Sequence, residues 1–296
     1  MLPGVELMTL VGITLFAATV NGALGYGFSS LTVPVALLFY SNRALSPALV
    51  LVEVILNGYT LLVNRKSVPE TWRRVLPILC GLIPGILAGT YILSRAHPEW
   101  LKFFTYVILL PLILLQAAGV RRPIRAKRAV GVPLGAGVGV LYSVTTISGP
   151  PLALMFNNQG FAKEKFRAGL AIIRVAESVL TASAYYFLGL YTETSTQIFS
   201  TIMPSVVIGI PLGAYLIRRM PSETFRRICM SFDAWVVGFG LSRALIGLEL
   251  MASPTAYGVW LLVVLIDMWL LYLYFRDRTS WGILSGRYFT PGRNYE

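Results

Sequence analysis

Charged residues are scarce in this chain, and histidine and cysteine are scarcer still. Only 13% of the 296 residues are charged, and the sequence contains one histidine and two cysteines. Soluble domains carry about 25% charged residues, so this low charge together with 56% hydrophobic residues excludes an ordinary soluble fold. The mean hydropathy of +0.69 points the same way. We therefore expect an all-α polytopic membrane protein.

Catalytic and metal-binding motifs are also lacking. The sequence contains no HExxH, no GxSxG, no Walker loop and no aspartate pair of an intramembrane protease. Cys80 and Cys229 lie in apolar stretches and are interpreted as small core residues, and His97 lies in a predicted loop. We therefore expect a protein that is not an enzyme and that binds neither a metal nor another cofactor.

Long apolar stretches are what the sequence does contain. A helix needs about 20 apolar residues to cross the hydrocarbon core. Two apolar regions are interrupted: residues 5–40 by NGALGYGFSS and residues 130–158 by YSVTTISGPP. Such breaks are typical of hairpins or broken spans inside the bilayer. The predicted uninterrupted spans are 44–63, 75–94, 101–119, 168–189, 197–217, 226–246 and 256–275.

Lysine and arginine gather in short segments between the apolar stretches. No nucleic-acid module accompanies the net charge of +12, so we attribute it to cytoplasmic loops, and nucleic acid is not an expected partner. If all the basic segments are cytoplasmic, residues 130–158 form a re-entrant hairpin, and by analogy residues 5–40 form one that opens to the exterior. The N-terminus is then outside and the C-terminus is cytoplasmic. Twenty of the 25 basic residues lie in 64–74, 121–128, 159–167, 218–227 and 276–296.

A weak internal repeat relates the two halves. The sequence SPALVLVEVIL (46–56) recurs 124 residues later as LAIIRVAESVL (170–180), which aligns Glu53 with Glu177. The predicted orientation runs the first copy inward and the second outward, so the repeats are inverted, as in many transporters that work by alternating access. The alignment continues from 84–102 to 208–226, pairing Gly85 with Gly209 and Gly89 with Gly213.

These patterns predict two inverted repeats, each a re-entrant helical hairpin plus three transmembrane helices, and one extra C-terminal transmembrane helix. Asp267 in the extra helix, beside Trp269, is interpreted as a packing or oligomer contact, which leaves a homodimer open. The predicted boundaries are 1–120 for the first repeat, 121–129 for a basic cytoplasmic linker, 130–247 for the second repeat, 248–275 for the extra helix and 276–296 for a cytoplasmic tail.

The two hairpin breaks form the predicted substrate site. Free backbone N–H groups at a helix start, together with hydroxyl donors, bind an anion without a full positive charge. Glycine allows the backbone to approach the ligand closely. The alternative is that these small residues serve only helix packing. The candidates are Gly25, Gly27, Ser29 and Ser30 in the first break and Thr145, Thr146, Ser148 and Gly149 in the second.

Two acidic residues lie deep inside apolar spans. Glu53 is about ten residues into its predicted helix, and Glu177 lies at the equivalent depth in the second repeat. Ionisable groups at that depth are costly and usually line a pathway or pair with one another. Arg174 precedes Glu177 by three residues on the same helix face, so the two form either a structural ion pair or part of the site. In the second interpretation, Arg174 contacts the anionic substrate and the glutamates exchange protons.

Several segments resemble the TauE/SafE family of sulfite and organosulfonate exporters, and the resemblance covers about residues 8–246. It implies export of a small sulfur-containing anion across the bacterial inner membrane, driven by an ion gradient. The family's usual GxGGG pattern is replaced here by GALGYGFSS, and Tyr26 and Phe28 leave the particular substrate open. The resembling segments are TTISGPPLALMFNNQGFAKEKFRAGLA (145–171), NGALGYGFSSLTVP (21–34), GILAG (85–89, from Gly85) and GIPLG (209–213).

Three alternatives stay open beside export. The same fold would also serve uptake or channel-like uniport of the same anions. A membrane scaffold without a substrate predicts hairpin tips that are filled by side chains. An intramembrane enzyme is disfavoured because the sequence lacks nucleophile, base and metal motifs.

Overall fold

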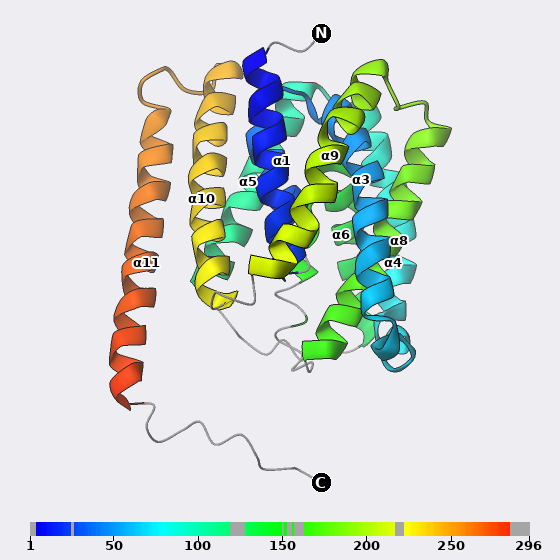
Figure 1. The fold of residues 1–296 in the computed structure, drawn as a ribbon. Helices are drawn as coiled ribbons and strands as arrows, with labels where there is room; N and C mark the ends of the chain where they lie inside the picture. The colour runs from blue at the N-terminus through cyan, green and yellow to red at the C-terminus, as the bar shows by residue number, and fades with distance from the viewer. Residues whose placement is uncertain are drawn as a thin grey trace.

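A computed structural model describes residues 4–24, 27–118, 128–149, 151–152, 156, 163–216 and 222–284. Every regular element in these ranges is a helix, and the long helices form one bundle (Figure 1). The elements are α1 (Gly4–Leu24), α2 (Phe28–Ala36), α3 (Asn42–Val63), the 3-10 turn η1 (Arg65–Ser67), α4 (Val68–Arg95), α5 (Pro98–Ala117), α6 (Arg128–Thr145), α8 (Lys163–Phe187), α9 (Glu193–Leu216), α10 (Ser222–Gly247) and α11 (Tyr257–Leu284).

The predicted spans are confirmed as helices. Within the described ranges, 8 helices are long and apolar enough to cross a membrane, which makes the chain a multi-pass membrane protein. Seven of them, α3, α4, α5, α8, α9, α10 and α11, correspond to the predicted spans. The eighth is α1, which continues into the break sequence NGALGYGFSS as far as Leu24. The helix α11 continues to Leu284, beyond the predicted apolar span 256–275, because an apolar window marks only the hydrocarbon part of a helix and polar turns extend past it.

Two interruptions occur where the Gly, Ser and Thr residues predict them. Gly27 precedes α2 with φ +106°, a left-handed conformation that glycine adopts without steric cost. Thr146 follows α6 with φ +57°, which is uncommon for a β-branched residue. After this break the Leu152 N–H donates to the Ser148 carbonyl at 3.2 Å, which begins a new helical turn. Each break therefore contains a left-handed residue among those that the structure describes.

The first helix of each half packs against a helix of the other half. The helix α1 packs against α9, and α6 packs against α4 (Figure 1). A Cβ atom on Gly85 would overlap the backbone carbonyl of Ala136, and one on Gly213 would overlap that of Thr19. Small residues permit such close helix contact in membranes. Between these two pairs, α3 and α8 pack directly against each other and bring their mid-helix residues together.

Cysteine placement differs from the expectation for one of the two residues. Cys229 is buried, as predicted, but Cys80 is exposed. Cys80 lies on the outer face of α4 in register with Leu76, Ile83 and Leu87, which are also exposed. The error arises because a helix that faces lipid is as apolar on its outside as on its inside. His97 lies between α4 and α5, as predicted.

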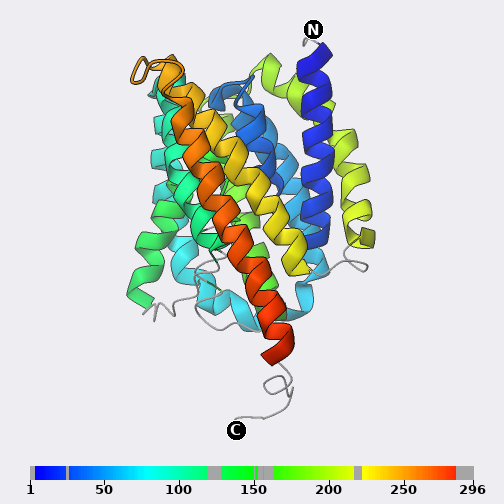
Figure 2. The same ribbon diagram turned by 90° about the vertical axis from the view of Figure 1, so that its left-hand side faces the viewer.

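The last helix, α11, runs along the outside of the bundle (Figure 2). A buried ion pair attaches it to α10: Arg227 Nη2 lies 2.9 Å from Asp267 Oδ1. Trp235 Nε1 donates to the other carboxylate oxygen of Asp267 at 3.1 Å. Asp267 is fully buried and is therefore a packing contact between two helices of one chain.

We expect Asp267→Asn to destabilise the protein by about 3–5 kcal/mol, because it leaves the Arg227 guanidinium buried without a counter-ion. Thermal unfolding of the detergent-solubilised protein, followed by tryptophan fluorescence, measures the change. The control is the apolar double variant Arg227→Met/Asp267→Leu, which removes both charges and should recover most of the loss. Equal unfolding temperatures for wild type and Asp267→Asn would show that the ion pair contributes nothing.

Candidate functional site

Glu53, Tyr142, Arg174 and Glu177 converge at the centre of the bundle. They come from three helices, α3, α6 and α8. Glu53, Tyr142 and Glu177 are fully buried, and Arg174 is 5% exposed. With Ser29 and Ser148 from the two breaks, these residues form what we call the carboxylate cluster.

Three donors surround the Glu53 carboxylate. Ser29 Oγ donates to Oε1 at 2.5 Å, and Tyr142 donates to Oε2 at 2.7 Å. Arg174 Nη2 donates to Oε1 at 3.0 Å and forms an ion pair with it. The donors come from α2, α6 and α8, so Glu53 joins four helices including its own. An ionised carboxylate only accepts hydrogen bonds, and this site supplies donors to both oxygens.

The Glu177 carboxylate has a sparser environment. Ser148 Oγ donates to Oε2 at 2.5 Å. Oε1 has no hydrogen-bond partner in the part of the chain that the structure describes, although it is buried. The two glutamates that the repeat aligns therefore differ in their surroundings.

The two halves nevertheless share one local arrangement. In each half, a serine just after the break donates to the glutamate of the same half: Ser29 to Glu53, and Ser148 to Glu177. Both serines are 2% exposed. The structure thus brings predicted substrate residues of both breaks to the predicted proton-coupling residues.

Arg174 forms its ion pair with Glu53 on α3, not with Glu177 on its own helix. Of the two alternatives for Arg174 and Glu177, the structural ion pair is therefore wrong, and a role of Arg174 in the site stays a prediction. Sequence spacing identifies only neighbours on one helix, whereas the direct packing of α3 on α8 offers Arg174 a fully buried carboxylate across the interface. Asn57 holds the same interface, because its side-chain amide donates to the Arg174 carbonyl at 3.2 Å.

The remaining candidates bond locally within the breaks. Ser30 Oγ donates to the Gly27 carbonyl at 3.2 Å. Thr145 Oγ1 accepts from the Ile147 N–H at 3.1 Å, and Thr146 Oγ1 donates to the Thr145 carbonyl at 2.7 Å. These hydroxyls fix the shape of the turns. Gly149 is buried at the second tip, and Gly25 lies outside the described residues.

Tyr142 is a site residue that the sequence interpretation missed. It is the first letter of the break sequence YSVTTISGPP, and it lies one helical turn before Thr146. The Thr146 N–H donates to its carbonyl, which fixes the distance between Tyr142 and the break. A buried tyrosine usually has a hydrogen-bond partner. A tyrosine at the start of the break could therefore have been predicted to contact one of the two buried glutamates.

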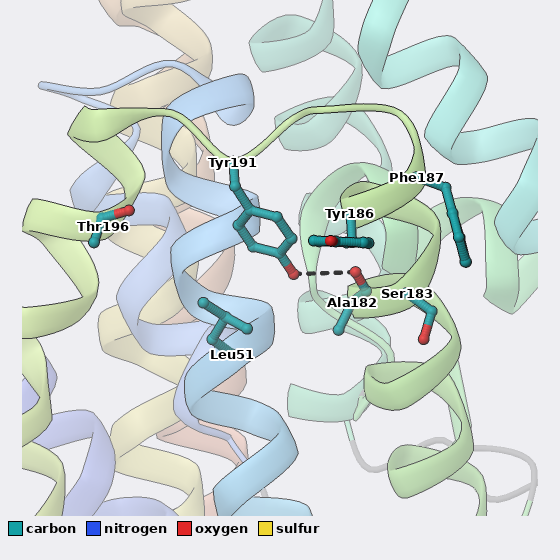
Figure 3. Close-up of a pocket in the computed structure, with 7 residues that line it drawn as sticks. All are labelled: Leu51, Ala182, Ser183, Tyr186, Phe187, Tyr191 and Thr196. Carbon is teal, nitrogen blue, oxygen red and sulfur yellow. Dashed lines mark hydrogen bonds between the residues drawn. The ribbon is translucent and has the colours of Figure 1, made fainter.

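An open groove lies between α3, α8 and α9 (Figure 3). None of its lining residues belongs to the carboxylate cluster. Leu51 lines the groove, whereas Glu53, two residues later on α3, points to the opposite side. Within the groove, the Tyr191 hydroxyl donates to the Ala182 carbonyl at 3.1 Å. The lining residues are Leu51, Ala182, Ser183, Tyr186, Phe187, Tyr191 and Thr196.

Comparison with known families gives one match. The sequence model described as "Sulfite exporter TauE/SafE" matches residues 10–240, which is more than half of the chain. The match contains both breaks and the whole carboxylate cluster, and it ends before α11. Comparisons with curated proteins and with solved structures gave no match. The family match confirms the resemblance seen in the sequence, and the chain belongs to the sulfite exporter TauE/SafE family.

Proposed function

We propose that this protein exports sulfite or an organosulfonate across the bacterial inner membrane by alternating access. The anion binds between the two hairpin tips, beside the carboxylate cluster. The observation that carries the proposal is the pair of equivalent contacts, Ser29 to Glu53 and Ser148 to Glu177, which join both breaks to mid-helix carboxylates. Membership of the exporter family supports the substrate class.

The chemistry of the tips suits an oxyanion. Sulfite and sulfonate groups present three oxygens that accept hydrogen bonds. Helix starts supply free N–H groups for the anion, and the Ser29 and Ser148 hydroxyls, which donate to Glu53 and Glu177, hold the two tips beside the carboxylates. Arg174 adds a planar guanidinium, whose Nε has no hydrogen-bond partner among the described residues.

The exchanged helix packing supports alternating access through two inverted repeats. The sequence repeat aligns α4 with α9, so the contact of α9 with α1 corresponds to the contact of α4 with α6. Glycines of α4 and α9 lie in both contacts, Gly85 against α6 and Gly213 against α1. Two related halves can adopt each other's conformation, which would open the site first to one side and then to the other. The carboxylate cluster would then lie at the point where the two halves meet.

We also propose that the C-terminus is cytoplasmic and the N-terminus outside. In Figure 1, α1 begins at one end of the bundle, and α11 ends at the opposite one. The basic turn η1 and the starts of α6, α8 and α10 lie at the end where α11 finishes. The positive-inside rule places that end in the cytoplasm.

Flux measurements in proteoliposomes test the proposed function. Labelled sulfite and labelled methanesulfonate are loaded separately, and efflux is followed from vesicles with and without the protein. We expect Ser148→Ala to slow efflux by about tenfold or more, because it removes the hydrogen bond from Ser148 to Glu177 at the second tip. A hydrogen bond to a charged group contributes about 1.5–3 kcal/mol.

Ser183→Ala is the matched control. This serine lies on α8 in the groove of Figure 3, and it donates only to the Val179 carbonyl of its own helix. Its efflux should equal that of the wild type. Equal efflux from Ser148→Ala would place the anion elsewhere, and no efflux of either anion from wild-type vesicles would favour the scaffold alternative.

A further inference from the structure

We infer that the two glutamates have different tasks: Glu177 takes up and releases the coupled proton, whereas Glu53 stays ionised as the fixed counter-ion of Arg174. This inference rests on the proposed function and deepens it. The sequence repeat treats the two residues as equivalent, and only their different surroundings separate them.

The contacts of Glu53 favour the ionised form. Both carboxylate oxygens accept hydrogen bonds, from Ser29, Tyr142 and Arg174. A protonated carboxyl would need an acceptor for its own O–H, and it would leave the buried guanidinium of Arg174 without its ion-pair partner. Protonation would therefore break several contacts at once.

The contacts of Glu177 leave room for a proton. Ser148 occupies Oε2, and Oε1 is buried without a partner in the described structure. A buried carboxylate oxygen without a donor is costly when the group is ionised, and a proton on that oxygen removes the charge. The proton binds to Oε1 when the site faces water on one side and leaves to water on the other, and the new O–H donates to an oxygen of the anion bound beside it.

The charged groups around Glu177 give the same assignment. Arg174 of α8 and Glu53 of α3 act on it electrostatically, as does Tyr142 of α6, whose hydroxyl donates to Glu53. Arg174 is already paired with Glu53, so the cluster holds one cation and two carboxylates.

The other elements that pack on α8 are α4 and η1, and their ionisable side chains do not face Glu177 from the bundle interior. Thr71 near the start of α4 contacts Gly169 of α8, about 12 Å along the helix from Glu177. Ionisable residues of this region and of the α4 outer face are exposed: Arg65, Lys66, Glu70, Arg73, Arg74, Cys80 and Tyr91.

Charge balance then predicts how proton and anion are coupled. With Glu177 ionised and no anion bound, the cluster has a net charge of about −1 from two carboxylates and one guanidinium. A proton on Glu177 neutralises it, and a bound monoanion restores the same charge. The empty and the loaded site therefore cost a similar free energy to hold in the membrane, so one proton moves with each monoanion in the same direction. The outward gradient of the anion, and not an inward proton gradient, then drives export.

Net flux compared with exchange tests this assignment. Vesicles are clamped at zero potential, and labelled methanesulfonate or sulfite is followed both as net efflux and as exchange against unlabelled anion. In Glu177→Gln the empty site is neutral and cannot release a proton, whereas the loaded site still carries about −1, so the two states no longer match in charge. We therefore expect the return of the empty site to slow and the ratio of net efflux to exchange to fall by about tenfold or more. A pH dye inside the vesicles should also show no proton movement with methanesulfonate, which stays ionised because sulfonates are strong acids.

Glu177→Asp is the conservative control, because it keeps a titratable carboxyl; it should retain proton movement and a ratio near that of the wild type. Infrared titration of the purified protein gives a second readout, in which Glu177→Gln should lose one carboxyl that protonates on acidification. Coupled proton movement or an unchanged infrared titration in Glu177→Gln would overturn the assignment. Wild-type vesicles that carry neither anion would instead overturn the proposed function.

Discussion

The Glu53→Gln variant is expected to lose about 3–5 kcal/mol of stability, because removing one partner of a buried ion pair leaves the other charge uncompensated. Arg174 is 5% exposed, and Glu53 accepts hydrogen bonds from three helices. The glutamine amide has one accepting oxygen, and its NH₂ group would lie against one of the groups that donate to Glu53, with which it cannot form a hydrogen bond. The unfolding temperature of the purified variant in detergent measures the loss.

The control is the charge-balanced double variant Glu53→Gln/Arg174→Gln. It removes both charges and retains side chains of similar size, so most of the lost stability should return. A double variant as unstable as the single one would show that the hydroxyl contacts dominate, and a single variant as stable as wild type would show that Glu53 is not the required counter-ion.

The second large effect is expected at Gly213, where even one added carbon has no room. A Cβ atom there overlaps the Thr19 carbonyl and approaches the Ala23 nitrogen of α1 to 2.8 Å. Backbone atoms cannot move aside as side chains can, so Gly213→Ala must push α1 away from α9. Overpacking of this kind costs about 1–3 kcal/mol or more.

Gly12→Ala is the matched control on α1. A Cβ atom at Gly12 meets nothing within 4 Å, so the same substitution should be neutral or stabilising there, by up to about 1 kcal/mol. Yield of monodisperse protein by size-exclusion chromatography and the unfolding temperature compare the two variants. Equal behaviour would mean that α1 and α9 are not closely packed.

Local sequence signals predicted most of the helices and both breaks. Long apolar stretches and clusters of Gly, Ser and Thr reflect properties of short segments, so they need no knowledge of the tertiary structure. The span α1 continues to Leu24, past the start of the break sequence NGALGYGFSS, because Asn and Gly interrupt an apolar pattern without ending the helix there. Within this span, the hydroxyls of Thr14 and Thr19 donate to carbonyls of their own helix, Leu10 at 2.7 Å and Leu15 at 2.8 Å, so these polar groups are satisfied locally.

The site could be predicted only in part, because its contacts join distant residues. Glu53 and Glu177 were identified from their depth in apolar spans, and Ser29 and Ser148 from the breaks. The partner of Arg174 and the role of Tyr142 depend on how α3, α6 and α8 pack, and Arg174 lies 121 positions from Glu53 in the chain. Helical spacing contains no information about such contacts.

The exchanged packing of α1 with α9 also constrains how the protein is made. The α1 residues that contact α9 emerge from the ribosome long before it: the nearest atoms to a Cβ on Gly22 belong to Ile210. Until α9 is synthesised, the face of α1 that contacts it has no partner, and contacts between distant residues slow folding. Each half of the chain therefore lacks the partner of its first helix until the other half has been made.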